Sequence, residues 1–183
     1  MDASALLAIG HLAAASAIAA MLAAGALAKL AARDDWLVAL AGYRLVPGPL
    51  IGGVAALLPA AELAVAILIV TGLGGAAGMI AGAGLLLAFA AAIAVNLLRG
   101  RRHIDCGCDP RGRPRPIGWP MVARNVALAG ILLGGIVAGP VAGGLPARLL
   151  AIVAGAGVYA LFRAIAILHS FAPRSTGAPN GAY

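Results

Sequence analysis

The sequence predicts an all-α, polytopic membrane protein: a bundle of about five transmembrane helices plus one short interfacial helix. Composition is the first observation, because 63% of the 183 residues are hydrophobic and only 10% are charged. Soluble domains are roughly half apolar and a quarter charged, and so short a chain cannot bury this much apolar surface in a water-soluble core. The second observation is that the apolar residues form runs of about 20 or more, long enough for a helix to cross a bilayer.

Five segments have the length and composition of a transmembrane helix. Four are almost wholly apolar, and the remaining one carries Arg124 and Asn125 in its first two turns. In chain order they are Ala3–Ala28, Leu50–Thr71, Ala76–Leu98, Ile117–Ala138 and Leu145–Leu168. The first lacks a basic start and exceeds the apolar region of a signal peptide, about 7–15 residues, so we expect it to be retained as a helix.

The stretch from Lys29 to Pro47 is amphipathic and predicts the interfacial helix. Asp34 and Asp35 look like its N-terminal caps. An apolar stripe then follows at helical spacing, formed by Trp36, Leu40 and Tyr43. Aromatic residues flanked by basic ones belong at the headgroup level of a membrane. We assign residues 1–171 to a single transmembrane domain and expect the polar tail 172–183 to be disordered.

Basic residues are distributed unevenly between the two ends of the predicted bundle. One end, which includes the loop after the third span, holds ten of them: Lys29, Arg33, Arg44, Arg99, Arg101, Arg102, Arg111, Arg113, Arg115 and Arg174. The other end has only Arg148. The positive-inside rule therefore places the N-terminus outside and this loop in the cytoplasm, and the net charge of +7 is a topology signal. No aromatic residues interleave with the arginines, so we expect the lipid bilayer and not nucleic acid as a partner.

The only two cysteines, Cys106 and Cys108, lie in this basic loop on either side of Gly107. Gly107 can adopt the positive φ of a turn that brings the two thiols within disulfide range. Strained, exposed disulfides exchange readily. The arginines at positions 99, 101 and 102 favour the thiolate, whereas Asp105 and Asp109 oppose it. A redox pair is the favoured interpretation.

Two alternatives for the cysteines stay open. A soft metal ion could be held by the two sulfurs, with His103 and Asp109 as weak candidates to complete four-coordination. The two thiols could also be inert. Because two sulfurs alone are a weak signal, we assign no metal site.

Polar residues inside the spans form a second group of candidates, since each is costly in lipid and marks function by default. Counted at 1.5 Å per residue from the outer face, His11 lies roughly 12 Å deep and Glu62 roughly 13 Å deep. We therefore expect His11 and Glu62 to pair in a proton-handling site. The alternative is that Glu62 is neutral or bonds backbone groups freed at Pro59.

A further set of polar side chains gathers near the opposite face, close to the cysteine loop. These residues are Asn96, Arg99, Arg124, Asn125 and Arg163. They are candidates to hold the loop, to bind an acidic lipid headgroup, or to extend their charged ends to the interface.

Three stretches of the chain resemble the MauE family of methylamine-utilisation membrane proteins, relatives of the DoxX-like group. The first is Tyr43–Pro47, and the second is Leu57–Leu63 with its Pro-x-x-Glu-Leu element. The third and most specific runs from Asn96-Leu97-Leu98-Arg99-Gly100-Arg101 to Asp105-Cys106-Gly107-Cys108, and continues with Gly118-Trp119 and Arg124-Asn125. The chain differs at Asp109-Pro110, where the family usually has an aromatic residue and glycine.

The resemblance implies a bacterial cytoplasmic (inner) membrane protein that supports redox maturation. MauE proteins are similar to membrane partners of a thioredoxin-like, MauD-like periplasmic protein, which serves disulfide formation or stability in the small subunit of methylamine dehydrogenase. Cys106 and Cys108 would then be the catalytic redox pair. Family-typical polar positions are matched by Glu62, Asn96, Arg99, Arg124 and Asn125, without an assigned role for each. No cofactor is predicted, and a quinone, though compatible with a redox role, has no support in the sequence.

The resemblance leaves two questions open. One is whether the chain is itself a thiol-disulfide oxidoreductase; the alternatives are a soft-metal binding or transport protein and a non-catalytic assembly factor. The other is the side of the loop, because the family's partner works outside whereas the charge rule places the cysteines inside. Electron transfer across the membrane, a loop that folds back, or a failure of the charge rule would each reconcile the two.

Overall fold

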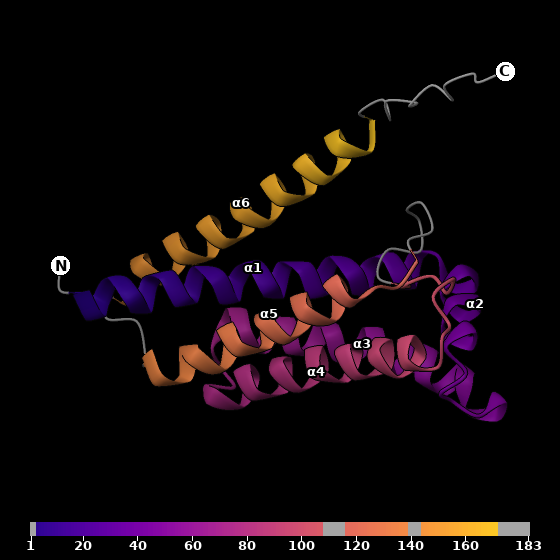
Figure 1. The fold of residues 1–183 in the computed structure, drawn as a ribbon. Coiled ribbons are helices and arrows are strands. Elements are labelled where there is room, and N and C mark those ends of the chain that lie inside the picture. The colour runs from indigo at the N-terminus through magenta and orange to yellow at the C-terminus, as the bar shows by residue number, and fades with distance from the viewer. Residues whose placement is uncertain (1–2, 108–115, 139–143, 172–183) are drawn as a thin grey trace, which may run out of the picture.

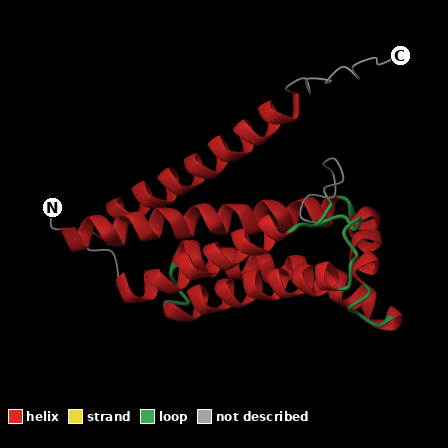
Figure 2. Cartoon of the chain, viewed as in Figure 1, coloured by secondary structure: helices red, strands yellow, loops and turns green. Residues whose placement is uncertain are grey.

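The computed structural model describes residues 3–107, 116–138 and 144–171. Its helices are α1 (Ala3–Ala31), α2 (Arg33–Tyr43), α3 (Ile51–Thr71), α4 (Ala76–Leu98), α5 (Trp119–Ala138) and α6 (Gly144–Phe171), with the short 3₁₀ turn η1 (Gly48–Leu50) before α3. Within those residues the only strand-like feature is an isolated bridge between Asp105 and Pro116 (Figure 2).

Five helices of the described chain are long and apolar enough to cross a membrane, which confirms the predicted fold class. They are α1, α3 with its leading turn, α4, α5 and α6. The predicted fourth span was expected to begin at Ile117, whereas α5 begins at Trp119. Pro120 explains this shift, because proline has a preset φ that suits the first turn of a helix. Ile117 instead donates its N–H to Ile104 O at 3.0 Å in the preceding loop.

The interfacial helix is present as α2, which crosses the end of the bundle roughly perpendicular to α1 (Figure 1). Ala32 separates the two helices with a non-helical φ of −125°. The expectation that Asp34 and Asp35 cap α2 is wrong, because Ala32 is the capping residue and no side chain caps the helix. The two carboxylates lie in the first turn, where they complement the positive end of the helix dipole. The predicted stripe of Trp36, Leu40 and Tyr43 is present, and the structure buries it within the protein.

The core lies where α1, α3, α4 and α5 meet, and small residues allow these helices to approach closely. Buried alanines and larger aliphatic residues share one cluster: Ala15, Ile18, Ala19, Leu22, Val65, Ala66, Ile69, Ala83, Leu86, Ala129 and Leu132. At Gly82 an added Cβ would lie 2.8 Å from Leu132 Cδ1, so a larger residue on α4 would require the Leu132 side chain of α5 to shift. Close packing of this kind is what joins helices in lipid, where apolar burial gives little advantage.

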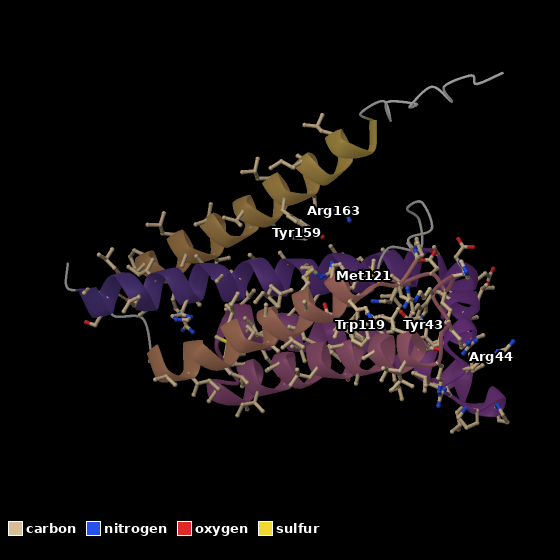
Figure 3. The ribbon with its side chains drawn as sticks, in the orientation of Figure 1. Tyr43, Arg44, Trp119, Met121, Tyr159 and Arg163 are labelled. Carbon is tan, nitrogen blue, oxygen red and sulfur yellow. The ribbon has the colours of Figure 1, made fainter. Side chains whose placement is uncertain are left out.

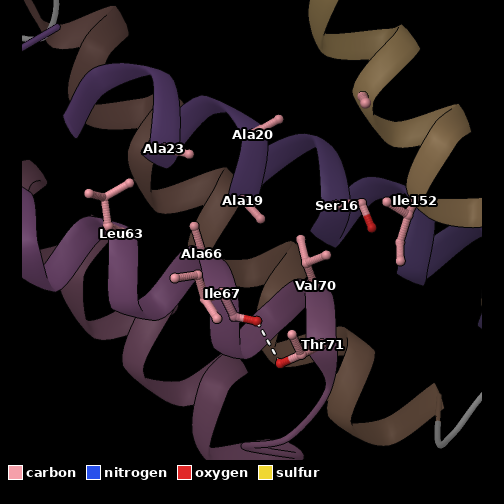
Figure 4. Close-up of a pocket in the computed structure, with 11 residues that line it drawn as sticks. Ser16, Ala19, Ala20, Ala23, Leu63, Ala66, Ile67, Val70, Thr71 and Ile152 are labelled. Atoms are coloured by element: carbon pink, nitrogen blue, oxygen red, sulfur yellow. Dashed lines mark hydrogen bonds between the residues drawn. The ribbon is translucent and has the colours of Figure 1, made fainter. Parts of the chain in front are cut away.

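Helix α6 lies against α1 over its first half and diverges from the bundle over its second half (Figure 1). At the crossing, an added Cβ on Gly155 would overlap the carbonyl oxygen of Ala13. Beyond the crossing its large apolar side chains are exposed and would face lipid: Val158, Leu161, Phe162, Ile165 and Leu168. A shallow apolar groove of about 290 Å³ runs between α1, α3 and α6, lined by residues that include Ser16, Ala66 and Ile152 (Figure 4).

The two ends of the bundle differ in charge as the sequence predicts. The turn after α3, with Gly72 at φ +69° and Gly75 at φ +50°, lies at the end where the chain begins (Figure 1). The guanidinium of Arg148 lies against Gly72 at this end. The exposed Arg33, Arg44, Arg99 and Arg102 lie at the other end, beside α2 and the cysteine loop.

This charge asymmetry predicts that the α2 end of the bundle lies in the cytoplasm. A reporter fused after Tyr183 should therefore be active only as a cytoplasmic fusion, such as green fluorescent protein, and inactive as a fusion to alkaline phosphatase. Insertion of the same reporters after Gly74 gives the matched control and should show the reverse pattern. Phosphatase activity at the C-terminus would contradict the orientation.

Candidate functional site

The chain's only lysine and only glutamate form an ion pair inside the bundle. Lys29 Nζ lies 2.6 Å from Glu62 Oε1 and 2.8 Å from Oε2, so both carboxylate oxygens accept a hydrogen bond. Glu62 is 1% exposed and Lys29 is 5% exposed. Charged side chains are rare at such positions and are retained when paired. This pair is the most unusual chemical feature of the membrane-embedded part of the chain.

The predicted pairing of His11 with Glu62 is wrong. His11 is half-buried and its ring lies against Gly134 and Gly135 of α5. The depth estimate assumed that α1 and α3 begin and end in common planes. The core cluster shows that they do not, since Ala15 and Ile18 of α1 share it with Ile69 near the end of α3. With this offset, Glu62 is level with the last turns of α1, about 18 residues or 27 Å along the helix from His11.

Side-chain direction brings Lys29 and Glu62 together across the offset. Side chains on a helix lean toward its N-terminus. Because α1 and α3 run in opposite directions (Figure 1), the Lys29 side chain leans back along α1 while Glu62 leans the other way, and their ends meet. The sequence identified Glu62 as a candidate but Lys29 only as one of the basic residues. The signal that could have identified Lys29 is that it is the chain's single lysine and lies at the end of an apolar run. The sequence did not signal that the two are partners.

Two aromatic rings surround the Lys29 ammonium. Nζ lies 5.3 Å from the centre of the Trp36 ring and 5.6 Å from the centre of the Phe89 ring. A cation over an aromatic face at this range gains electrostatic stabilisation, and more when water is excluded. The ion pair is therefore enclosed by α2 and α4 as well as by the helices that carry it.

Trp36 also compensates for the proline in α3. Pro59 has no N–H, so the carbonyl of Ala55, four residues earlier, lacks its helical hydrogen bond. The indole Nε1 of Trp36 donates to Ala55 O at 3.0 Å and supplies that bond. The alternative in which Glu62 satisfies groups freed at Pro59 is thus also wrong. The Pro-x-x-Glu spacing has a structural reason: Pro59 and Glu62, three residues apart, lie on one buried face of α3.

Arg101 fastens the cysteine loop to α2 and α4. Its Nη1 donates to Asn96 Oδ1 at 3.0 Å and to Tyr43 O at 3.1 Å, and its Nη2 donates to Gly42 O at 2.9 Å. Asn96 is fully buried, and its backbone carbonyl also accepts the Arg101 N–H at 2.9 Å. The role of holding the loop therefore falls to Asn96, as one of the open interpretations allowed, together with Arg101. The sequence identified Arg101 only as one of several basic residues.

Cys106 lies in a turn that is held from both sides. Tyr43 Oη donates to Cys106 O at 3.1 Å, and the Gly107 N–H donates to Asp105 Oδ1 at 3.1 Å. Gly107 has the positive φ that was predicted, +66°. Tyr43 itself belongs to a small apolar cluster against which Cys106 and Met121 pack (Figure 3).

Cys106 is disulfide-bonded in the structure. The chain's other cysteine, Cys108, lies outside the described residues, as does Asp109. The assignment of the two cysteines as a redox pair is not tested by the structure and stays a prediction. His103, the other weak metal candidate, is exposed, and no cluster of three or more His, Cys, Asp or Glu residues occurs within the described ranges.

The remaining predicted polar residues lie near this end of the bundle but have different surroundings. Asn125 is buried in α5 and its Oδ1 accepts a hydrogen bond from Arg124 Nη2 at 3.3 Å. Arg124 and Arg99 are exposed, Arg99 at the end of α4. Arg163 lies on the diverging half of α6 (Figure 3). These arginines are not brought together with the ion pair.

The surroundings of Tyr43 favour its protonated form. Burial, and then the negative charge of Asp105, raises the pKa of Tyr43 from 10.0 to about 12. The phenol is therefore a stable hydrogen-bond donor to the Cys106 carbonyl at neutral pH.

Comparison with known proteins gives one consistent result. The family model described as "Methylamine utilisation protein MauE" matches residues 5–138. The protein named Methylamine utilization protein MauE from Paracoccus versutus is 38% identical over 175 residues, covering 93% of this chain and 94% of the relative. The protein of the same name from Paracoccus denitrificans is 41% identical over 131 residues, covering 71% of this chain and 67% of the relative. The one from Methylophilus methylotrophus is 47% identical over 119 residues, covering 63% of this chain and 62% of the relative. No solved structure matches. The ion pair, Trp36 and Cys106 all lie within the matched range.

Loss of one partner of the buried ion pair should destabilise the bundle strongly. Glu62→Gln leaves the Lys29 ammonium without its counter-charge, and breaking a buried pair typically costs about 3–5 kcal/mol. The Tm of the detergent-solubilised protein should fall accordingly. Ile67→Ala, at a 58% exposed side chain on the same helix, is the control and should change the Tm little. The double variant Lys29→Met/Glu62→Leu, which removes both charges, should recover most of the loss, and an unchanged Tm for Glu62→Gln would contradict a stabilising pair.

In the folded protein, Tyr43 should lose its proton only at a pH well above the ordinary range for tyrosine. Because its folded pKa of about 12 exceeds the ordinary value of 10.0, its contribution to stability is complete below pH 10 and is lost as the pH rises through 12. The Tyr159→Phe/Tyr183→Phe chain keeps Tyr43 as its single tyrosine, so phenolate absorbance reports this group alone. Titration at the ordinary value while the helices remain folded would show that Tyr43 is not buried beside Asp105.

Proposed function

Because this chain belongs to the MauE family, we propose that it serves methylamine utilisation as a multi-pass protein of the bacterial cytoplasmic membrane. Within that role, it supports thiol-disulfide maturation of a periplasmic amine dehydrogenase subunit or a similar client. The relatives' name, Methylamine utilization protein MauE, supports the metabolic setting. The five apolar helices support the membrane setting. The maturation role depends on the chemistry available at Cys106.

The observation that carries the redox proposal is a disulfide-bonded cysteine in a turn held by side-chain hydrogen bonds. Tyr43 and the Asp105 side chain bond the backbone at Cys106 and Gly107, each at 3.1 Å. Arg101 fastens the start of the loop to α2 and α4 with hydrogen bonds of 2.9 to 3.1 Å. Cys106 is nevertheless only half-buried, at the end of the bundle. A disulfide that is held in place but reachable from the aqueous side is suited to exchange with a protein partner.

The reaction is exchange with a thioredoxin-like partner that carries two thiols. A partner thiolate attacks one sulfur of the Cys106–Cys108 disulfide, which breaks the loop S–S bond and forms a mixed disulfide. The second partner thiolate then attacks the mixed disulfide and releases the loop with both cysteines reduced. Two electrons and two protons pass from the partner's dithiol to the loop, and the partner gains one disulfide. The difference between the two reduction potentials sets the direction.

Thiol trapping in cells tests whether the pair cycles. Rapid acid quenching followed by alkylation with a maleimide mass tag should show oxidised and reduced populations of Cys106 and Cys108. Cells treated with a strong oxidant or with a strong reductant provide the two reference positions on the gel. A single form that neither treatment converts would rule out a redox role. Comparison of a membrane-impermeant with a permeant reagent in the same cells also locates the loop.

Single substitutions should trap the exchange partner. In Cys106→Ser or Cys108→Ser the remaining thiol can form the mixed disulfide but cannot resolve it from the loop side. We expect at least one of the two to accumulate a reductant-sensitive adduct with a protein that has a thioredoxin-like dithiol, identified by mass spectrometry. The double serine variant is the control and should give no adduct. Full support of amine dehydrogenase maturation by the double variant would favour the non-catalytic assembly factor.

A further inference from the structure

Trp36 lies between the buried ion pair and the cysteine loop and contacts both. We propose that Trp36 is the positioning residue of the redox loop: its indole, fixed by Lys29 and Ala55, is the surface on which the oxidised Cys106–Gly107 turn docks. The Lys29–Glu62 pair thereby influences the reduction potential of a disulfide that it does not touch. This inference rests on the proposed exchange at Cys106.

The indole is fixed on the side of the bundle by two contacts of different kinds. Its Nε1 donates to Ala55 O at 3.0 Å, and this carbonyl is available only because Pro59 lacks an N–H. Its ring faces the Lys29 ammonium at 5.3 Å. Trp36 is 5% exposed, so neither contact competes with bulk water. A hydrogen bond at one edge and a cation over the face leave the ring little freedom to rotate.

The opposite edge of the same ring supports the turn that contains Cys106. A Cβ added to Gly107 would lie 3.0 Å from Trp36 Cζ3 and 3.3 Å from the Ala39 Cβ. The loop backbone is therefore in direct packing contact with α2 at the residue beside Cys106. Gly107 is required there twice, because its φ of +66° disfavours a side chain and because the indole occupies the space.

Docking and disulfide formation are therefore linked equilibria. The structure shows Cys106 oxidised while Gly107 is seated on the indole. Reduction opens the small ring and releases the constraint that holds Gly107 at a positive φ, so the reduced loop loses part of this contact. Any contact made better by the oxidised than by the reduced loop stabilises the disulfide by the difference. Loss of the indole should make the disulfide easier to reduce.

The ion pair affects the cysteine loop because it places the Lys29 ammonium over the face of the Trp36 ring. Glu62 holds the Lys29 ammonium with two hydrogen bonds of 2.6 and 2.8 Å, and this placement puts the charge over Trp36. With Gln at position 62, Lys29 loses its counter-charge and is free to turn toward the aqueous end of α1, as a long basic side chain near a helix end does. The indole then loses one of its two fixing contacts.

The decisive experiment measures the redox equilibrium of the full-length protein in lipid nanodiscs. Protein equilibrated in buffers of defined reduced and oxidised glutathione is quenched and tagged with maleimide, and the reduced fraction is quantified on gels. For Trp36→Phe, which keeps an aromatic ring but removes the N–H donor and the outer ring edge, the equilibrium constant for reduction by glutathione should rise about tenfold. For a two-electron couple this is a shift of about 30 mV toward easier reduction.

The chain offers a matched control in its other tryptophan. Trp119 is 50% exposed at the start of α5, and Trp119→Phe should leave the glutathione equilibrium within twofold of the wild type. An unchanged equilibrium in Trp36→Phe would overturn the inference. If Trp36→Phe does not fold, the Trp119→Phe chain, whose fluorescence comes from Trp36 alone, decides the question. Its emission should change on reduction of Cys106, and an emission unaffected by reduction would also overturn it.

A double-mutant cycle tests the link to the ion pair. Glu62→Gln should shift the glutathione equilibrium in the chain with Trp36 and have little effect in the Trp36→Phe background. Equal shifts in both backgrounds would show that the pair does not act through the indole. Failure of the proposed function can be told apart from failure of this inference. If glutathione cannot reduce and re-form the wild-type disulfide, exchange itself is excluded. If the wild type cycles and Trp36→Phe has the same equilibrium, only the role of Trp36 is excluded.

Discussion

The salt bridge between Lys29 and Glu62 constrains how the bundle can be assembled. In a medium without water, burying an isolated charge costs roughly several kcal/mol, even after the surrounding protein has relaxed. A helix register that separated the two groups would leave the Glu62 carboxylate unpaired in an apolar environment, which favours the offset of α1 and α3 at which the side chains meet. Apolar packing among alanines and leucines tolerates several registers, whereas a single pair of charges tolerates few. Specificity of register is the best-supported use of buried polar groups.

The contacts around the ion pair depend on a backbone hydrogen bond that is missing from α3. Pro59 removes one hydrogen bond from α3 and leaves the Ala55 carbonyl to be satisfied within the protein, because lipid supplies no donor. The indole N–H of Trp36 fills that role at 3.0 Å. The donor comes from α2, so the defect also ties the interfacial helix to the transmembrane one. The same ring then supports Gly107, and through it the loop at Cys106 is joined to the interior of the bundle.

The described part of the cysteine loop, up to Gly107, is fastened to the bundle by hydrogen bonds near Cys106. The Arg101 guanidinium donates to Asn96 and to the backbone carbonyls of Gly42 and Tyr43 at the end of α2, so its charge is engaged in holding the loop. Tyr43 remains protonated because of burial and the nearby Asp105, and donates to the Cys106 carbonyl. Among the arginines of the loop's described residues, Arg99 and Arg102 are exposed and are free of these anchoring bonds. Family membership gives these features a setting in methylamine utilisation, and their chemistry supports a redox role there.

Composition and helical rise were sufficient to determine the architecture. Runs of about 20 apolar residues have one stable form in lipid, so the five spans, the interfacial helix with its apolar stripe, and the glycine turn at Gly107 could all be predicted. The family could be identified because its motifs are local in sequence. Only the tertiary structure decided which polar residues meet. His11 and Glu62 were expected at one depth, but depth depends on how far helices slide past each other, and sliding is set by packing and by the partner that a charge finds. Lys29 is that partner. Trp36 and Arg101 likewise act on groups 19 and 58 to 59 residues away, relationships that no local pattern encodes.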